Sequence, residues 1–138
     1  EAMIETLLEA VRRGVDVRII TPHIPDKKHI KYMTEYNYGI LLKNGIRIYE
    51  YEPGFIHSKV VMNEHCAIVG TINMDYRSLY HHFENGCFMA DCDAVLDIRR
   101  DMEQTLEQCR EVTEKYKSGR SATLRLGQLF LRLFAELL

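Results

Sequence analysis

The sequence predicts an α/β fold in which a mixed β-sheet is flanked by helices on both faces. A unit made of a helix-periodic segment, a glycine and a β-rich run occurs twice in the first half, at Gly14 and Gly45, and such alternation is typical of α/β sheets. The second half adds short β-rich runs that follow one another closely, as in hairpins. With 138 residues, of which 46% are hydrophobic and 28% charged, the chain has the composition of a globular domain with its own core.

The first half is expected to contain four elements. They are a helix over 2–13, a strand over 15–20, a helix over 27–43 and a strand over 46–51. The first helix is indicated by apolar residues at helical spacing, namely Ile4, Leu7, Leu8 and Val11. Gly14 and Asn44-Gly45 follow the two helices and end them, because a glycine readily takes the left-handed conformation found after a helix. Pro22 and Pro25 close the first strand.

The second half is expected to hold a hairpin, a strand and a long helix. Two β-rich runs, 56–62 and 67–69, are joined by a short connection that contains Asn63-Glu64-His65, which predicts a tight hairpin. A further strand is expected over 86–90, and Asp91 or Asp93 can cap the helix that follows it. The apolar stripe of that helix comprises Val95, Ile98, Met102, Leu106, Cys109 and Val112. Ser118-Gly119 ends it.

Charge and cysteine usage limit the classes of function. The net charge is −2, so binding of nucleic acid through bulk charge is not expected. Residues 12–47 carry eight basic and three acidic side chains, which suits either an anionic substrate nearby or solvated helix faces. The four cysteines form no Cys-x-x-Cys pair, and they therefore predict free or buried thiols instead of a zinc or redox site.

Four polar residues point to a phosphate site. His57 and Lys59 are two positions apart, so on a strand their side chains would share one face. Two potentially cationic groups side by side are unfavourable to bury unless an anion lies between them. The turn after the next run can bring the Thr71 hydroxyl and the Asn73 amide to the same face. A histidine, a lysine, an amide and a hydroxyl together suffice to bind a phosphodiester.

These residues also resemble a family signature. The spacing His57-x-Lys59-x-x-x-x-Glu64, followed by Gly-Thr-Ile-Asn at 70–73, resembles the motif of the phospholipase D superfamily. The run 45–59 and the words Asn-Met-Asp-Tyr-Arg-Ser at 73–78 and Phe-Glu-Asn at 83–85 are similar to the second, C-terminal catalytic half of bacterial-type cardiolipin synthases. The resemblance covers roughly residues 1–90 by wording and the remainder by layout.

The resemblance implies a role for each matching residue. His57 would be the nucleophile that forms a phosphohistidine, or the acid/base partner of a histidine in the other half. Lys59, Thr71 and Asn73 would bind the phosphoryl oxygens. Glu84 lies where the family has an acidic residue that orients the catalytic histidine, and a carboxylate paired with an imidazole also fits the needs of an activated nucleophile. The resemblance implies neither a metal nor another cofactor.

Glu64 is the one clear departure from the family motif. The family has aspartate at this position of the motif, and by that match Glu64 is expected to be catalytic together with His57 and Lys59. Glutamate keeps the charge but adds one methylene. A role in fixing the hairpin through hydrogen bonds would tolerate that change, whereas a role that needs close geometry would not.

The family builds its active site from two such motifs, and this sequence has one. Residues 1–118 are therefore expected to form the second phospholipase D-like half, with the motif region at 52–79. Residues 119–138 are expected to form an amphipathic helix that docks on a protein surface or lies on anionic lipid. The missing half would be the N-terminal half of the same parent chain or a second copy, and the sequence, which starts inside a helical pattern, is expected to be a piece of a longer protein.

Three functions remain open. The first is cardiolipin synthesis from two phosphatidylglycerol molecules with release of glycerol, in a bacterial membrane protein whose catalytic domain lies on the cytoplasmic side or at the membrane surface. In that case phosphatidylglycerol and anionic lipid are the partners, nucleic acid is not, and this fragment is soluble and inactive without its other half. The second is a homodimeric phosphodiesterase or nuclease. The third is a lobe that binds anionic phospholipid without turning it over.

Overall fold

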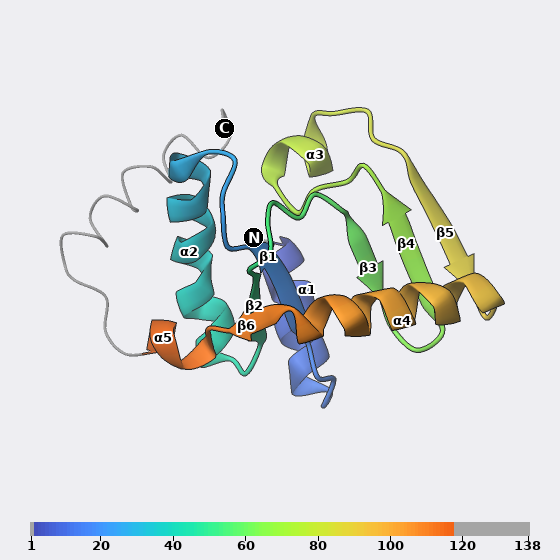
Figure 1. Ribbon diagram of the computed structural model, residues 1–138, viewed down its shortest axis with the longest axis horizontal. Helices are drawn as coiled ribbons and strands as arrows, with labels where there is room; N and C mark the ends of the chain where they lie inside the picture. Colours follow the sequence, from blue (N-terminus) through green and yellow to red (C-terminus); the bar gives the residue numbers. More distant parts are fainter. Residues whose placement is uncertain (1, 118–138) are drawn as a thin grey trace.

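The structure, a computed structural model, describes residues 2–117 (Figure 1). The helix expected over 119–138 lies outside the described residues. The helices are α1 (Ala2–Arg12), α2 (Lys28–Lys43), α3 (Tyr76–Tyr80), α4 (Asp93–Glu107) and α5 (Thr113–Lys117). The strands are β1 (Arg18–Pro22), β2 (Arg47–Tyr51), β3 (Val60–Met62), β4 (Cys66–Gly70), β5 (Gly86–Ala90) and β6 (Cys109–Glu111). None of these described helices is long and apolar enough to cross a membrane.

The first sheet contains β1, β2 and β6 in that order. β1 and β2 are parallel and β6 is antiparallel to β2, so this sheet is mixed. The two helix–glycine–strand units predicted from the sequence are confirmed. Gly14 and Gly45 both have φ of +87°, a left-handed conformation that costs glycine nothing because it has no Cβ.

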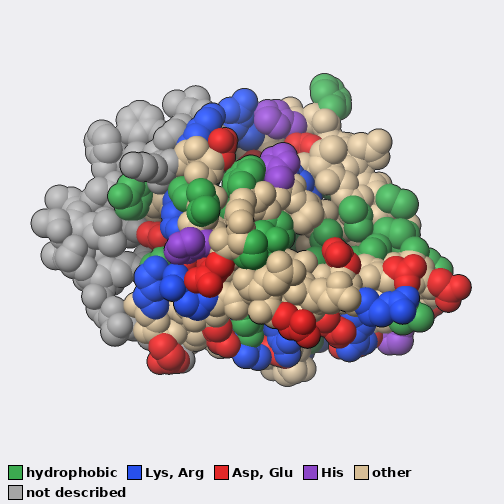
Figure 2. Space-filling model, in the orientation of Figure 1, with side chains coloured by type: hydrophobic (Ala, Val, Ile, Leu, Met, Phe, Trp, Pro, Cys, Tyr) green, Lys and Arg blue, Asp and Glu red, His purple; other side chains and the backbone are tan. Residues whose placement is uncertain are grey.

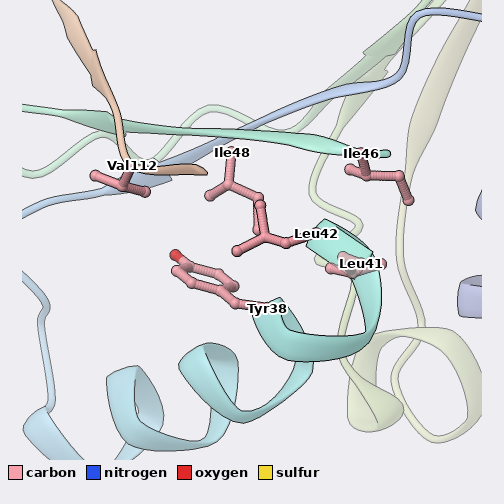
Figure 3. Packing of buried hydrophobic residues seen from close by; sticks show 6 residues of the cluster. All are labelled: Tyr38, Leu41, Leu42, Ile46, Ile48 and Val112. Atoms are coloured by element: carbon pink, nitrogen blue, oxygen red, sulfur yellow. The ribbon is translucent and has the colours of Figure 1, made fainter. Parts of the chain in front are cut away.

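The hydrophobic core lies between α2 and β2 (Figure 3). Its buried side chains are Tyr38, Leu41, Leu42, Ile46, Ile48 and Val112. Half-buried residues of α1 pack against the same cluster. The core thus fixes β2, whose carboxyl end leads through residues 52–56 to His57.

The second sheet consists of β3, β4 and β5, all antiparallel. α4 packs against this sheet and against β2 and β6, and in Figure 1 it runs along the lower edge of both sheets. Ala67 of β4 and Val95 of α4 are buried there. The opposite face carries a cross-strand row formed by Val61, Ile68 and Phe88, all exposed. Figure 2 shows hydrophobic side chains gathered over these strands, above the mixed charges of α4.

The α/β class is confirmed, but one predicted helix is too long. α4 ends at Glu107, and Cys109–Glu111 forms β6 instead of a last helical turn. The pairing partners explain the change, because Tyr51 lies opposite Cys109 and Tyr49 opposite Glu111. The hydrogen bonds of Cys109–Glu111 to β2 stabilise a strand here more than the apolar stripe stabilises a helix. Val112 is buried in the core in either case.

β1 also lies later than predicted, at Arg18–Pro22 instead of 15–20. Pro22 is part of the strand and lies opposite Tyr51. Proline has no backbone N–H and cannot donate a hydrogen bond to a neighbouring strand, so it is found mainly in edge strands. Within residues 2–117, β1 pairs with β2 alone, so the strand can accommodate a proline.

Candidate phosphate-binding site

His57 and Lys59 lie in the extended segment that leads into β3. β3 begins at Val60, so the prediction that strand alternation places both side chains on one strand face is wrong. The Gly70 N–H donates to the Lys59 carbonyl at 3.2 Å, but Thr71, the next residue, pairs with Asn85 on the other side. The segment before Lys59 therefore has no ladder partner among the described strands.

The Lys59 side chain nevertheless reaches back to the backbone of His57. Lys59 Nζ donates to the His57 carbonyl oxygen at 2.5 Å. The His57 ring is exposed and lies 5.5 Å, centroid to centroid, from the Phe55 ring at an interplanar angle of 35°. An exposed imidazole beside an ammonium group is a suitable surface for a phosphate anion.

Gly70 allows the two ends of the signature to meet. A Cβ at Gly70 would lie 2.1 Å from the Asn85 carbonyl oxygen and 2.7 Å from the Gly86 Cα. Only glycine permits such a close backbone approach. As a result, Thr71 and Asn85 exchange two bonds: the Thr71 N–H donates to the Asn85 carbonyl at 2.9 Å, and the Asn85 N–H donates to Thr71 Oγ1 at 3.0 Å.

Glu84 is held by hydroxyl groups from two elements. Thr71 Oγ1 donates a short hydrogen bond to Glu84 Oε2. The hydrogen bond from Thr71 and then that from Ser78 lower the pKa of Glu84 below its ordinary value. His82 Nδ1 lies 3.6 Å from Glu84 Oε1. Glu84 is therefore an ionised acceptor at neutral pH.

The structure joins some of the predicted site residues and not others. It brings Thr71 and Glu84 together, and it links Lys59 to Gly70 through the backbone. Among the interactions of residues 2–117, no hydrogen bond or ion pair joins Glu84 to His57, so the orienting role of Glu84 stays a prediction. Ser78 and His82 also contact Glu84; the sequence analysis assigned them no role in the site, although Ser78 closes one of the family-like words.

Asn73 lies between this network and α3. It is exposed, and the described part of the chain gives its side chain no hydrogen-bond partner. Asp75, two residues later, caps α3 by accepting from the Ser78 N–H at 2.8 Å. The cap fixes where the helix starts, and it leaves the Asn73 amide available to a ligand.

Glu64 lies in the turn between β3 and β4, away from the end of the hairpin where His57 lies. It is exposed, and β3 separates it from Lys59 by three residues at about 3.3 Å each. The turn is held by Asn63, whose Oδ1 accepts from the N–H groups of His65 at 2.8 Å and Cys66 at 2.9 Å. Asn63 thus makes the hydrogen bonds that fix the hairpin turn, the role considered for Glu64. The sequence analysis did not single out Asn63.

Other ligand chemistry is sparse around the site. Within residues 2–117, no group of three or more His, Cys, Asp or Glu side chains could hold a metal ion. The four cysteines are free. The candidate site thus comprises an imidazole, an ammonium and an amide that can contact a phosphodiester directly, and a carboxylate that accepts the proton of a neighbouring hydroxyl.

Comparisons with known proteins give a consistent picture. Residues 1–106 match the family described as cardiolipin synthase, PLD-like domain. The chain is 45% identical over 130 residues to an uncharacterized protein of Streptococcus mutans, and the match covers 94% of this chain and 28% of that protein. It is 35% identical over 137 residues to cardiolipin synthase 2 of Bacillus cereus, covering 99% of this chain and 27% of the relative. Cardiolipin synthase of Geobacillus kaustophilus is 34% identical over 139 residues, 100% of this chain and 28% of the relative.

A solved structure has the same fold. The crystal structure of Nuc, a phospholipase D family member from Salmonella typhimurium, superposes with a TM-score of 0.67 at 17% sequence identity. The match covers 78% of this chain and 71% of that one. The chain thus spans little more than a quarter of the length of the curated relatives that it matches, whereas it spans most of this solved chain.

Proposed function

The chain belongs to the phospholipase D-like domain family of cardiolipin synthases, and from that membership we propose that it forms one half of the active site of a cardiolipin synthase. The reaction is phosphatidyl transfer between two phosphatidylglycerol molecules, which yields cardiolipin and glycerol. Phosphatidylglycerol and anionic membrane lipid are the partners, and nucleic acid is not expected to be one. The observation that carries the proposal is the backbone hydrogen bond from Gly70 to Lys59, which joins the His57-x-Lys59 segment to the Thr71–Glu84 network.

The chemistry requires two displacements at one phosphorus. A ring nitrogen of His57 attacks the phosphodiester of the first lipid, the bond to the glycerol headgroup breaks, and the departing oxygen takes a proton from an acid in the other half. A glycerol hydroxyl of the second lipid then gives up its proton to the same group and attacks the phosphohistidine. The bond to His57 breaks, and the product has one phosphatidyl group at each end of the glycerol.

The remaining residues stabilise charge during these steps. Lys59 and Asn73 bind the non-bridging oxygens, where negative charge develops. Thr71 is proposed to join them, which requires its hydroxyl proton to turn from Glu84 to the phosphate. Glu84 is proposed to orient His57 by accepting from its ring N–H and to stabilise the protonated form. Glu64 is included among the catalytic residues because of its place in the motif. Any effect of Glu64 on catalysis would act through the hairpin turn in which it lies.

The other half of the site comes from the N-terminal half of the same parent chain or from a second copy. The parent protein is proposed to lie at the cell membrane, because its substrates are membrane lipids. An isolated fragment with one motif is expected to be inactive, since the acid that protonates the leaving glycerol belongs to the missing half.

A homodimeric phosphodiesterase is the second candidate. One observation favours it: the chain covers 71% of the solved family member, so a chain of about this size exists within the superfamily as a unit of its own. The same residues would then act on a soluble phosphodiester or a nucleic acid, with water as the acceptor.

Product analysis tests the proposal. The intact protein is incubated with phosphatidylglycerol vesicles, and the lipids are identified by mass spectrometry. Cardiolipin with free glycerol is the expected result. Phosphatidic acid alone, or no lipid product, would contradict the transferase and favour the phosphodiesterase. His57→Ala is expected to abolish turnover without unfolding the protein, whereas His65→Ala, at the exposed hairpin turn, keeps the wild-type rate.

A further inference from the structure

A fully buried carboxylate lies outside the site described above. Glu50 of β2 has 0% exposure, and a buried charge is tolerated only when it is paired. His23 Nδ1 lies 2.9 Å from Glu50 Oε2. The Tyr116 hydroxyl lies 3.3 Å from Glu50 Oε1 and shares its one proton with Glu35 Oε1, the nearer acceptor at 2.8 Å. Lys31 Nζ is 3.8 Å from Oε1, and Arg110 Nη2 is 3.6 Å from Oε2. Partners from the loop after β1, from α2, from β6 and from α5 thus converge on one side chain.

The buried carboxylate determines how His23 is held. Burial by itself raises the pKa of Glu50, but the hydrogen bond from His23 and the charge of Lys31 outweigh it, so the pKa lies below its ordinary value. An ionised carboxylate can only accept, and Nδ1 of His23 must therefore carry the proton. The second ring nitrogen, Nε2, is left for other partners. The His23 side chain is 39% exposed, so the imidazole is anchored on one side and open to solvent on the other.

Positive groups accompany this imidazole. Lys31 Nζ donates to the His23 backbone carbonyl oxygen at 2.6 Å and lies 3.8 Å from Glu50 Oε1, so both Lys31 and His23 contact the same carboxylate. Lys31 also lines a pocket of about 180 Å³, together with Pro25, Tyr32 and Glu35. Arg110 offsets Glu50 and Glu52. An imidazolium at His23 and the ammonium of Lys31 would be two cationic hydrogen-bond donors at one carboxylate, a combination that suits a phosphate oxygen.

The cluster lies at the same end of the first sheet as His57. The His23 N–H donates to the Tyr51 carbonyl at 3.0 Å, so His23 sits where the parallel strands β1 and β2 end. His57 follows Tyr51 by six residues and is therefore within about 20 Å of it. Ligands of α/β sheets bind outside the carboxyl ends of the parallel strands. His23, held by Glu50, and His57 therefore lie at the same edge of the sheet, an arrangement that fits a substrate pair with two phosphates.

We propose that His23, positioned by Glu50 and accompanied by Lys31, binds the phosphate of the second, acceptor phosphatidylglycerol. The inference rests on the proposed function, because only a transferase needs a second lipid. Glu50 acts through His23 and is a positioning residue. The phosphate of the donor lipid stays with Lys59, Thr71 and Asn73, so the two phosphates have separate sites.

The test separates transfer to a lipid from transfer to water. In the intact protein, His23→Gln is compared with wild type in phosphatidylglycerol vesicles, and cardiolipin and phosphatidic acid are both quantified. We expect cardiolipin formation at low phosphatidylglycerol to fall about tenfold, the loss of one charge-assisted hydrogen bond, through a higher apparent KM. Phosphatidic acid, which needs the donor alone, should not fall. Lys31→Gln should act in the same direction.

A matched control removes a comparable pair elsewhere. His65 Nδ1 lies 3.2 Å from Asp91 Oδ1 at the exposed end of the hairpin, and His65→Gln should leave both products at wild-type levels. An equal loss of both products in His23→Gln, no loss of either, or the same loss in His65→Gln would overturn the acceptor site.

A binding measurement keeps the site testable if wild type forms no cardiolipin, an outcome that refutes the proposed function alone. Histidine ¹⁵N signals of the intact protein are followed during titration with inorganic phosphate, with glycerophosphoglycerol and with phosphatidylglycerol vesicles. The site predicts that the His23 Nε2 signal moves with the last two and that the His65 signals do not. No movement, or a response to inorganic phosphate alone, would overturn the headgroup assignment.

Discussion

Replacing Gly70 by alanine would place a methyl group where the backbone of the next strand already lies. The new Cβ would be 2.1 Å from the Asn85 carbonyl oxygen and 2.7 Å from the Gly86 Cα. Both obstacles are backbone atoms, so no side chain can rotate away. The strands β4 and β5 would have to separate by about 1 Å at this end to restore a normal contact.

The cost follows from what the separation breaks. Forcing an extra methyl group into a packed position costs about 1–3 kcal/mol. The two bonds between Thr71 and Asn85, at 2.9 and 3.0 Å, contribute roughly 0.5–1.5 kcal/mol each. We therefore expect Gly70→Ala to lower the free energy of unfolding by about 2–6 kcal/mol.

Urea unfolding measures this directly, with Gly54→Ala as the matched control. A Cβ at Gly54 would meet nothing within 4 Å, so that variant should keep the wild-type midpoint. Gly70→Ala should have a lower midpoint with an unchanged slope. Equal midpoints for the two variants would refute the reasoning, because they would show that the contact at Gly70 relaxes without cost.

Three further predictions concern the core, the turn and pH. Ile48→Ala, at a position with 0% exposure, should lower the free energy of unfolding by about 2–5 kcal/mol, and a midpoint within error of wild type would contradict the core assignment. Asn63→Ala removes the acceptor for two backbone N–H groups and should lower the free energy of unfolding, measured by thermal unfolding, by about 1–2 kcal/mol. Glu64→Ala, at an exposed position, should cause no measurable change. A larger loss in Glu64→Ala than in Asn63→Ala would show that Glu64 fixes the turn. The hydrogen bond from Arg47 lowers the pKa of Glu111 to about 2, so its stabilisation is present above the ordinary pKa near 4.5 and is lost as pH falls toward 2. Both side chains are more than a third exposed, which keeps the effect below about 1 kcal/mol, and Glu111→Gln should flatten the acid limb of a stability–pH profile.

Local signals in the sequence were enough for the elements of the first half. Gly14 and Gly45 mark helix ends because their left-handed backbone is a property of the residue and its immediate neighbours. The alternation around Ile48 predicted β2 for the same local reason. β6 could not be predicted in this way, since Cys109 and Val112 also continue the apolar stripe of α4. Its pairing with β2 joins residues about sixty positions apart, and no local pattern records such a partner.

The candidate site divides along the same line. The types and spacing of His57, Lys59, Thr71 and Asn73 are written in the sequence, because chemistry at a phosphate depends first on which groups are present. Their arrangement is not, and the expected strand through His57 begins only at Val60, because Thr71 pairs with Asn85 instead of with the segment around His57.

The sequence by itself therefore determined the α/β class and the family-like motif, both of which depend on residue type and short-range order, and it is the basis on which phosphate chemistry is predicted. Only the tertiary structure decided which side chains share an environment. In the structure Thr71 hydrogen-bonds to Glu84, Asn63 accepts the hydrogen bonds that hold the turn, and Glu50 is buried in contact with His23 and Lys31. Burial and pairing of charge depend on elements that are distant along the chain, and they arise only when the core has brought those elements together.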